Sequence, residues 1–182
     1  MANEKKMDCV ILGLLSHESM TGYEIKKHID YSLRFFWGAS YGSIYPTLNS
    51  LMKEEMVTKE ETKENGREKI IYTITDKGHQ RLKEWLKEPA EKNELRFETL
   101  LKLFFGGEIG SRETLKHILQ FEEKVKEELQ HLERCVDSLT PIQEEVDHQY
   151  YLLTAQFGVE IYKAYLAWCK QTEKVLKQMN KN

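Results

Sequence analysis

The chain has 182 residues, of which 40% are hydrophobic and 31% are charged, a balance typical of one folded domain or of two small ones. Its three prolines and ten glycines leave little material for disordered linkers. The formal net charge of −3 gives no general attraction to nucleic acid or to anionic membranes, although it does not decide whether a local basic patch exists.

The first residues are not expected to be a secretion signal or a membrane anchor. Two lysines precede an apolar run within residues 3–16, but the run is short and no small-residue cleavage site follows it. We therefore expect a cytoplasmic protein with no membrane partner. Cys9, Cys135 and Cys169 are far apart and form no C-x-x-C pair. Reduced thiols are expected, with no structural metal and no cofactor.

Two helices are predicted near the N-terminus. Residues 8–16 are almost entirely apolar, which predicts a central helix that is buried on all sides. Thr21 is followed three residues later by Glu24, the spacing of a capping box. Because apolar residues then recur every four positions, a second helix is predicted over residues 21–33.

A third helix is predicted where Ile44, Leu48 and Leu51 fall on one stripe. A helix that begins at residue 42 or 43 would hold Pro46 in its first turn, where amide hydrogens have no partner within the helix. At 100° per residue, the face opposite the stripe holds four residues: Gly42, Pro46, Asn49 and Lys53.

A β-hairpin is predicted after the third helix. Asn65-Gly66 lies between two segments, the second of them rich in β-branched and aromatic residues, and this dipeptide is a strong hairpin signal. A two-residue turn would pair Val57 with Ile74. Thr75 or the next residue would then cap a fourth helix that ends near Pro89, which predicts a first domain of residues 1–88.

Residues 89–182 are predicted to be helical throughout. A short segment with a stripe of apolar residues is followed by two long helices. Each long helix has an apolar seam and a charged outer face. An 88-residue domain cannot cover both seams, so a second copy of the chain is expected to do so. The residues predicted at this homodimer interface are Leu101, Phe104, Val125, Leu129, Leu132, Phe157, Ile161 and Trp168.

The order of three helices and a hairpin in about 80 residues is that of a winged helix-turn-helix domain. The segments "ILGLLSHESMTGYEI", "SYGSIYPTLNSLMKEEMV" and "REKIIYTITDKGHQRLKEW" resemble the PadR family of transcriptional regulators. "LRFETLLKLFFGGE" and the tail around Trp168 resemble the branch with a long helical C-terminal domain. The resemblance implies a mainly α protein, with an N-terminal winged helix-turn-helix carrying a two-stranded wing (1–88) and a C-terminal long-helix dimerisation domain (89–182).

The resemblance also implies double-stranded DNA as a partner. The third helix would enter the major groove, the start of the second would meet phosphate, and the wing would contact the neighbouring backbone or minor groove. Asn49 is the best candidate for a base contact and Lys53 for a phosphate contact. The residues placed at DNA are Thr21, Tyr23, Lys26, Gly42, Ser43, Tyr45, Pro46, Asn49, Lys53, Gly66, Arg67 and Lys69.

Without the resemblance, Ser43 fits equally well as a helix cap and Asn49 as an ordinary polar surface residue. The acidic residues around the hairpin turn predict few phosphate contacts and a shallow dependence of DNA binding on salt.

Aromatic residues suggest a site for a small aromatic or phenolic effector, formed by Phe36, Trp37, Phe157, Tyr165 and Trp168. Aromatic residues at helical spacing also suit a core or a dimer seam. No nucleophile, base or phosphate-binding motif is present in a catalytic arrangement, so the chain is not expected to be an enzyme. The leading hypothesis is a homodimeric transcriptional regulator that binds a pseudo-palindromic operator. Repression is expected in preference to activation. The alternative is a winged-helix module for protein interaction or scaffolding.

Overall fold

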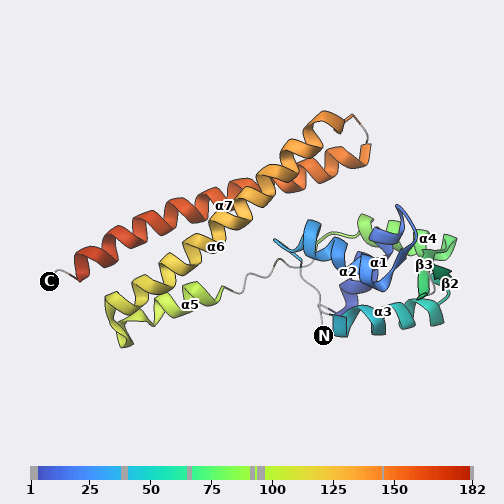
Figure 1. Cartoon of the computed structure of the whole chain (residues 1–182), viewed down its shortest axis with the longest axis horizontal. Coiled ribbons are helices and arrows are strands. Elements are labelled where there is room, and N and C mark those ends of the chain that lie inside the picture. Colours follow the sequence, from blue (N-terminus) through green and yellow to red (C-terminus); the bar gives the residue numbers. More distant parts are fainter. Residues whose placement is uncertain are drawn as a thin grey trace. The chain divides into compact units, whose positions relative to one another are not determined.

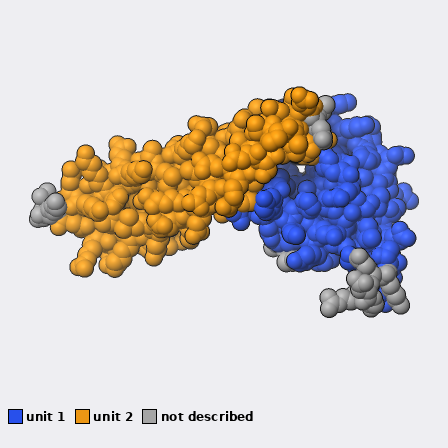
Figure 2. Space-filling model, turned by 45° about the horizontal axis from the view of Figure 1, so that its top comes forward, with its two compact units in different colours: residues 1–93 blue, residues 94–182 orange. Residues whose placement is uncertain are grey.

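The chain forms two compact units, residues 1–93 and 94–182, in the computed structural model (Figures 1 and 2). The structure describes residues 4–37, 41–64, 67–90, 93, 97–144 and 146–180. Within these ranges no helix has both the length and the apolar character needed to cross a membrane.

The first unit packs four α-helices and a small sheet around one core (Figure 1). Ile11 and Leu12 are completely buried, as the dense apolar run in this segment predicted. The core also takes Ile25 from the second helix and Ile44 from the third. The helices of this unit are α1 (Glu4–Leu15), α2 (Gly22–His28), α3 (Tyr41–Lys53) and α4 (Asp76–Lys87), with a π-helical segment η1 (Ile29–Leu33) that continues α2.

The sheet has three antiparallel strands in the order β1-β3-β2, namely β1 (Met20–Thr21), β3 (Arg67–Ile74) and β2 (Val57–Glu64). Val57 pairs with Ile74, so the register predicted from a two-residue turn is confirmed. The turn residues 65 and 66 lie outside the described residues. The two-residue strand β1 pairs with β3 through Met20 and Thr21 and was not predicted, because two residues are too few to show a period.

The second helix of the sequence prediction is in fact two elements. The capping box at Thr21 is present, and α2 starts there as expected. From Ile29 onward the chain forms a π-helix, a wider turn that occurs mostly as short insertions in α-helices. Ile29 remains completely buried there, so the apolar spacing predicted the burial but not the type of helix.

The second unit is a pair of long helices with a short helix beside it (Figure 1). Its elements are α5 (Glu98–Phe104), the 3-10 turn η2 (Gly106–Glu108), α6 (Gly110–Leu139), the 3-10 turn η3 (Thr140–Ile142) and α7 (Val146–Met179). The core between α6 and α7 contains Ile118, Val125, Leu132, Cys169 and Leu176, all of them buried. Burial raises the pKa of the Cys169 thiol to about 11, which keeps it protonated at neutral pH.

Candidate nucleic-acid interface

Helix α3 has one buried face and one exposed face. Ile44 and Leu48 are 0% exposed and anchor the helix in the core. Ser43 is half-buried, and its backbone carbonyl accepts a 2.7 Å hydrogen bond from Thr47 Oγ1. The exposed face carries Gly42, Tyr45, Pro46, Asn49 and Lys53. Of the six residues of α3 that were predicted at DNA, all except Ser43 therefore share one accessible surface.

Pro46 lies inside α3, beyond its first turn, which corrects the expectation of a first-turn proline. A proline there cannot donate a hydrogen bond to the carbonyl of Gly42, four residues earlier, and its ring crowds that carbonyl. Both residues are on the exposed face, so the carbonyl that lacks this bond is on the outer side of the helix. The side chains at these two positions are small, so they project little beyond the helix backbone in this part of α3.

The start of α2 is fixed by a reciprocal set of hydrogen bonds between Thr21 and Glu24. The Glu24 carboxylate accepts hydrogen bonds of 2.8 Å from both the backbone N–H and the hydroxyl of Thr21. The Thr21 hydroxyl oxygen in turn accepts from the Glu24 backbone N–H at 3.2 Å. These bonds hold the pKa of the Glu24 carboxyl below its usual value. The Thr21 hydroxyl is therefore occupied by the cap.

The other two α2 residues predicted at DNA differ in accessibility. Tyr23 is 63% exposed, and its ring extends from the first turn of the helix. Lys26 forms an ion pair with Asp30, one turn later, and its side chain is only 13% exposed. Of these two, Tyr23 offers the larger accessible surface.

The hairpin carries more exposed acidic than basic side chains in its described part. Glu60, Glu61 and Glu68 are exposed, and Lys59 pairs with Glu61 at 3.0 Å. Lys69 is half-buried and contributes to the low pKa of Glu24, after the hydrogen bonds from Thr21 and opposed by burial. Gly66 and the side chain of Arg67 lie outside the described residues.

One contact between α2 and α3 was not predicted from the sequence. Gly22, the first residue of α2, is buried beneath the ring of Tyr45 from α3. The contact joins the two elements that the sequence analysis placed at phosphate and in the major groove. Gly22 has no side chain and adds nothing to the apolar spacing of a helix. Its position directly after the helix cap Thr21 was therefore the only feature of the sequence that drew attention to it.

The aromatic residues predicted to bind an effector belong to both units. Phe36 is exposed and packs edge-on against Phe35 in the first unit. The indole Nε1 of Trp37 is buried and has no hydrogen-bond partner within the part of the chain that the structure describes. Burying an N–H without an acceptor is unfavourable, which makes this nitrogen a candidate donor to a ligand.

In the second unit, Tyr165 and Trp168 both pack against Phe121, with ring centroids 5.9 and 6.2 Å apart respectively. Phe157 is 62% exposed. Trp168 also lines a largely apolar groove of about 590 Å³ between α5, the start of α6 and the end of α7. The other lining residues are Leu103, Gly106, Gly107, Gly110, Ser111, Thr114, Gln171, Thr172, Val175, Leu176 and Met179.

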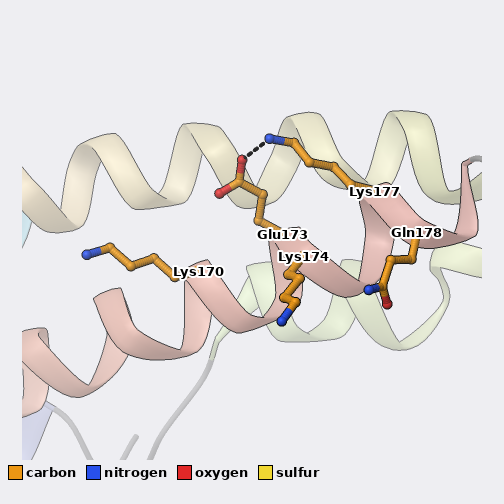
Figure 3. Close-up of a pocket in the computed structure, with 5 residues that line it drawn as sticks. All are labelled: Lys170, Glu173, Lys174, Lys177 and Gln178. Atoms are coloured by element: carbon orange, nitrogen blue, oxygen red, sulfur yellow. Dashed lines mark ion pairs between the residues drawn. The ribbon is translucent and has the colours of Figure 1, made fainter.

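A second, charged depression of about 360 Å³ lies on the outer side of α7 (Figure 3). Its lining residues are Lys170, Glu173, Lys174, Lys177 and Gln178, and Lys177 pairs with Glu173 at 2.5 Å. All five come from one helix, and none was predicted as a site residue.

The predicted dimer residues divide into three groups by exposure. Leu101 and Phe104 of α5 are 59% and 81% exposed, and Phe157 of α7 is also exposed. Val125 and Leu132 are 1% and 2% exposed within one copy. They lie in the core between α6 and α7 and expose almost no surface in one copy, so their place at a dimer interface stays a prediction. Leu129, Ile161 and Trp168 are half-buried.

Within the described residues, no group of three or more His, Cys, Asp or Glu side chains is arranged to hold a metal ion. The geometry instead offers one exposed helix face beside a capped helix start and a hairpin, which is the arrangement of a winged helix-turn-helix surface.

Comparison with known proteins agrees with this geometry. The model of the transcriptional regulator PadR-like family matches residues 11–84, and the model described as virulence activator alpha C-term matches residues 95–177. The negative transcriptional regulator PadR of Bacillus subtilis (strain 168) is 31% identical over 180 residues, covering 94% of this chain and 96% of the relative.

Two crystal structures of Bacillus subtilis PadR are similar along almost the whole chain. The complex with operator DNA has a TM-score of 0.81 at 28% identity and covers 93% of this chain and 97% of that one. The complex with p-coumaric acid has a TM-score of 0.72 at 25% identity and covers 96% and 97%. The chain therefore belongs to the PadR-like family of transcriptional regulators, which are DNA-binding proteins and not enzymes.

Proposed function

We propose that this chain is a homodimeric repressor that binds a pseudo-palindromic operator and is released from it by a small aromatic acid. Residues 1–88 would form the DNA-binding domain and residues 89–182 the dimerisation domain. The observation that carries the proposal is the exposed face of α3, which lies opposite a fully buried face in a fold shared with an operator-bound relative.

The chemistry of this face suits a major groove. An asparagine amide both donates and accepts a hydrogen bond and can contact N6 and N7 of adenine at once, which makes Asn49 the base-contacting residue of the proposal. Lys53, exposed in the last turn of α3, would contact phosphate. Gly42 and Pro46 allow the helix backbone to approach the base edges closely. Tyr23 and the first amides of α2 would face a neighbouring phosphate.

The proposed dimer rests on apolar surface that one copy leaves exposed. The second unit exposes Leu101, Phe104, Phe105, Leu153 and Phe157, each by more than half of its surface. Exposed apolar side chains in this number indicate a protein interface, and a second copy of the chain is the simplest partner. A two-fold dimer would present two α3 helices to successive major grooves, about one helical turn apart.

Repression is the proposed direction of control because a relative that covers 94% of this chain is a negative transcriptional regulator. A regulator of this kind would act in the cytoplasm, where the DNA is accessible. The effector part rests on the relative's complex with p-coumaric acid and on the Nε1 of Trp37, which has no hydrogen-bond partner among the described residues. An effector would act by binding the DNA-competent and DNA-incompetent forms of the dimer with different affinity.

A gel-shift titration with the DNA upstream of the chain's own gene tests the proposal. We expect a specific complex that p-coumaric acid dissociates. The same acid should quench tryptophan fluorescence, and the quenching should weaken in Trp37→Phe or Trp168→Phe. Trp85→Phe is the matched control, because Trp85 also packs against the core of the first unit but is not among the residues proposed to bind the effector.

No shift at low salt would contradict operator binding and favour the protein-interaction alternative. A shift that is unaffected by p-coumaric acid would contradict only the effector part.

A further inference from the structure

Gly22 has no conformational reason of its own to be glycine. It is the first residue of α2, and its backbone does not have the left-handed φ that favours glycine. Alanine is favoured over glycine by up to about 1 kcal/mol inside helices, so a glycine here weakens the element unless something occupies the space of a side chain.

The ring of Tyr45 occupies that space. A β-carbon built on Gly22 would lie 2.8 Å from Cε1, 3.0 Å from Cζ and 3.1 Å from Oη of Tyr45, and these are the three nearest atoms. Carbon atoms at van der Waals contact are about 3.5 to 4.0 Å apart, so alanine at this position would displace the ring. The far end of the Tyr45 side chain therefore rests directly on the backbone of α2.

The central strand of the sheet carries a buried tyrosine, Tyr72. Burial raises the pKa of the Tyr72 hydroxyl, and the charge of Tyr45 is the second cause of this shift. Tyr72 is 5% exposed and pairs with Met20 of β1 and Lys59 of β2. The contact of the Tyr45 side chain that supports the inference is therefore the one with the backbone at the start of α2.

We propose that Tyr45 is a positioning residue that fixes the recognition helix α3 against the start of α2. Gly22 has no side chain and so leaves the space that the ring of Tyr45 occupies. The inference rests on the proposed DNA-binding function, which needs α3 at base edges and α2 at phosphate simultaneously. The distance between those two contacts is set by the ring of Tyr45 lying on Gly22. The Tyr45 hydroxyl then has no necessary role at the DNA, although Tyr45 is among the residues that the sequence placed there.

A double-mutant cycle on operator affinity tests this inference. We expect Gly22→Ala and Tyr45→Ala each to weaken operator binding by about tenfold, while binding to nonspecific DNA changes little. Gly22→Ala/Tyr45→Ala should bind no worse than Tyr45→Ala, because the new methyl group has nothing left to displace. Tyr45→Phe keeps the ring on Gly22 and should stay within about twofold of the unsubstituted chain.

The effect of Gly22→Ala on the Tm of thermal unfolding should differ between the two backgrounds. In the Tyr45→Ala background, Gly22→Ala should raise the Tm, because alanine is the better helix former. In the unsubstituted chain it should not raise the Tm. Gly78→Ala is the matched control, since its β-carbon would lie 2.3 Å from the backbone oxygen of Met56 and should lower the Tm in both backgrounds.

Two results would overturn the inference while leaving operator binding intact: additive losses in the double mutant, or a loss in Tyr45→Phe as large as in Tyr45→Ala. The second result would assign a DNA contact to the hydroxyl. Failure of the unsubstituted chain to bind any upstream DNA would instead overturn the proposed function, and the inference with it.

Discussion

The Glu24 carboxylate accepts two hydrogen bonds from Thr21, one from its backbone N–H and one from its hydroxyl. Thr21 is also the last residue of β1, where it pairs with Ile71. One residue therefore ends a strand, caps α2 and fixes the direction in which the first turn of that helix points. The capping box is the local reason that the start of α2, which is proposed to face phosphate, has a defined position.

Replacing Glu24 with Gln should make the free energy of unfolding less dependent on pH in the acidic range. The folded-state pKa of Glu24 is lowered from 4.5, so its charge stabilises the fold at neutral pH. That contribution is lost as the pH falls below about 4.5 and through the lowered pKa. Glutamine keeps the hydrogen-bonding geometry of a capping box without the charge. Urea unfolding from about pH 7 to about pH 3 should show the difference between the two proteins shrinking toward zero. A difference that stays constant over this range would contradict the assignment.

Replacing Asn49 with Ala should weaken operator binding by about 1 to 3 kcal/mol per half-site. The loss should be confined to specific DNA, because a base contact adds nothing to phosphate binding. Ser50→Ala is the matched control, since Ser50 is the next exposed residue of α3 and its hydroxyl donates to Glu54. An unchanged footprint in Asn49→Ala would make this residue an ordinary surface side chain.

Operator binding should depend only shallowly on salt, with a slope of log K against log salt no steeper than about −8 for the dimer. In the described part of the hairpin, exposed glutamates outnumber the exposed cations that could contact phosphate. Glu60→Lys, on the exposed part of β2, should steepen the slope by adding up to one phosphate contact per copy. A slope steeper than about −8 in the unsubstituted protein would show that phosphate contacts are more numerous than proposed.

Phe104→Glu should convert the dimer into a monomer. Its side chain is 81% exposed in one copy, and a charge there would be buried against apolar surface in the proposed interface. Sedimentation equilibrium should give twice the chain mass of 21.5 kDa for the unsubstituted protein and a single mass for the variant. Leu86→Glu, a similarly exposed apolar position on α4, is the control and should leave the mass unchanged. A single mass for the unsubstituted protein would exclude the dimer and its operator geometry.

Local patterns predicted most of the fold. The Asn65-Gly66 dipeptide was enough to predict the pairing of Val57 with Ile74, since turn length fixes hairpin register. Apolar spacing predicted the buried face of α3. The position of Pro46 was predicted wrongly because helix starts are the least certain part of such a pattern, and α3 already includes Tyr41.

The candidate site residues were less predictable from the sequence, because their exposure depends on which helix faces pack against each other in the folded chain. Apolar spacing places Val125 and Phe104 on seams in the same way, yet the first is covered by α7 of its own copy and the second is exposed. No one-dimensional pattern distinguishes these cases. The contact of Gly22 with Tyr45 joins two helices across 23 positions of sequence and likewise follows only from the packing.

Hydroxyl-radical footprinting of the DNA upstream of the chain's own gene tests the central claim most directly. The proposed dimer should protect two symmetry-related regions whose centres are about one helical turn apart. It should do so with two chains bound per duplex. Absence of protection at low salt, or a single unsymmetrical region protected by one chain, would contradict it.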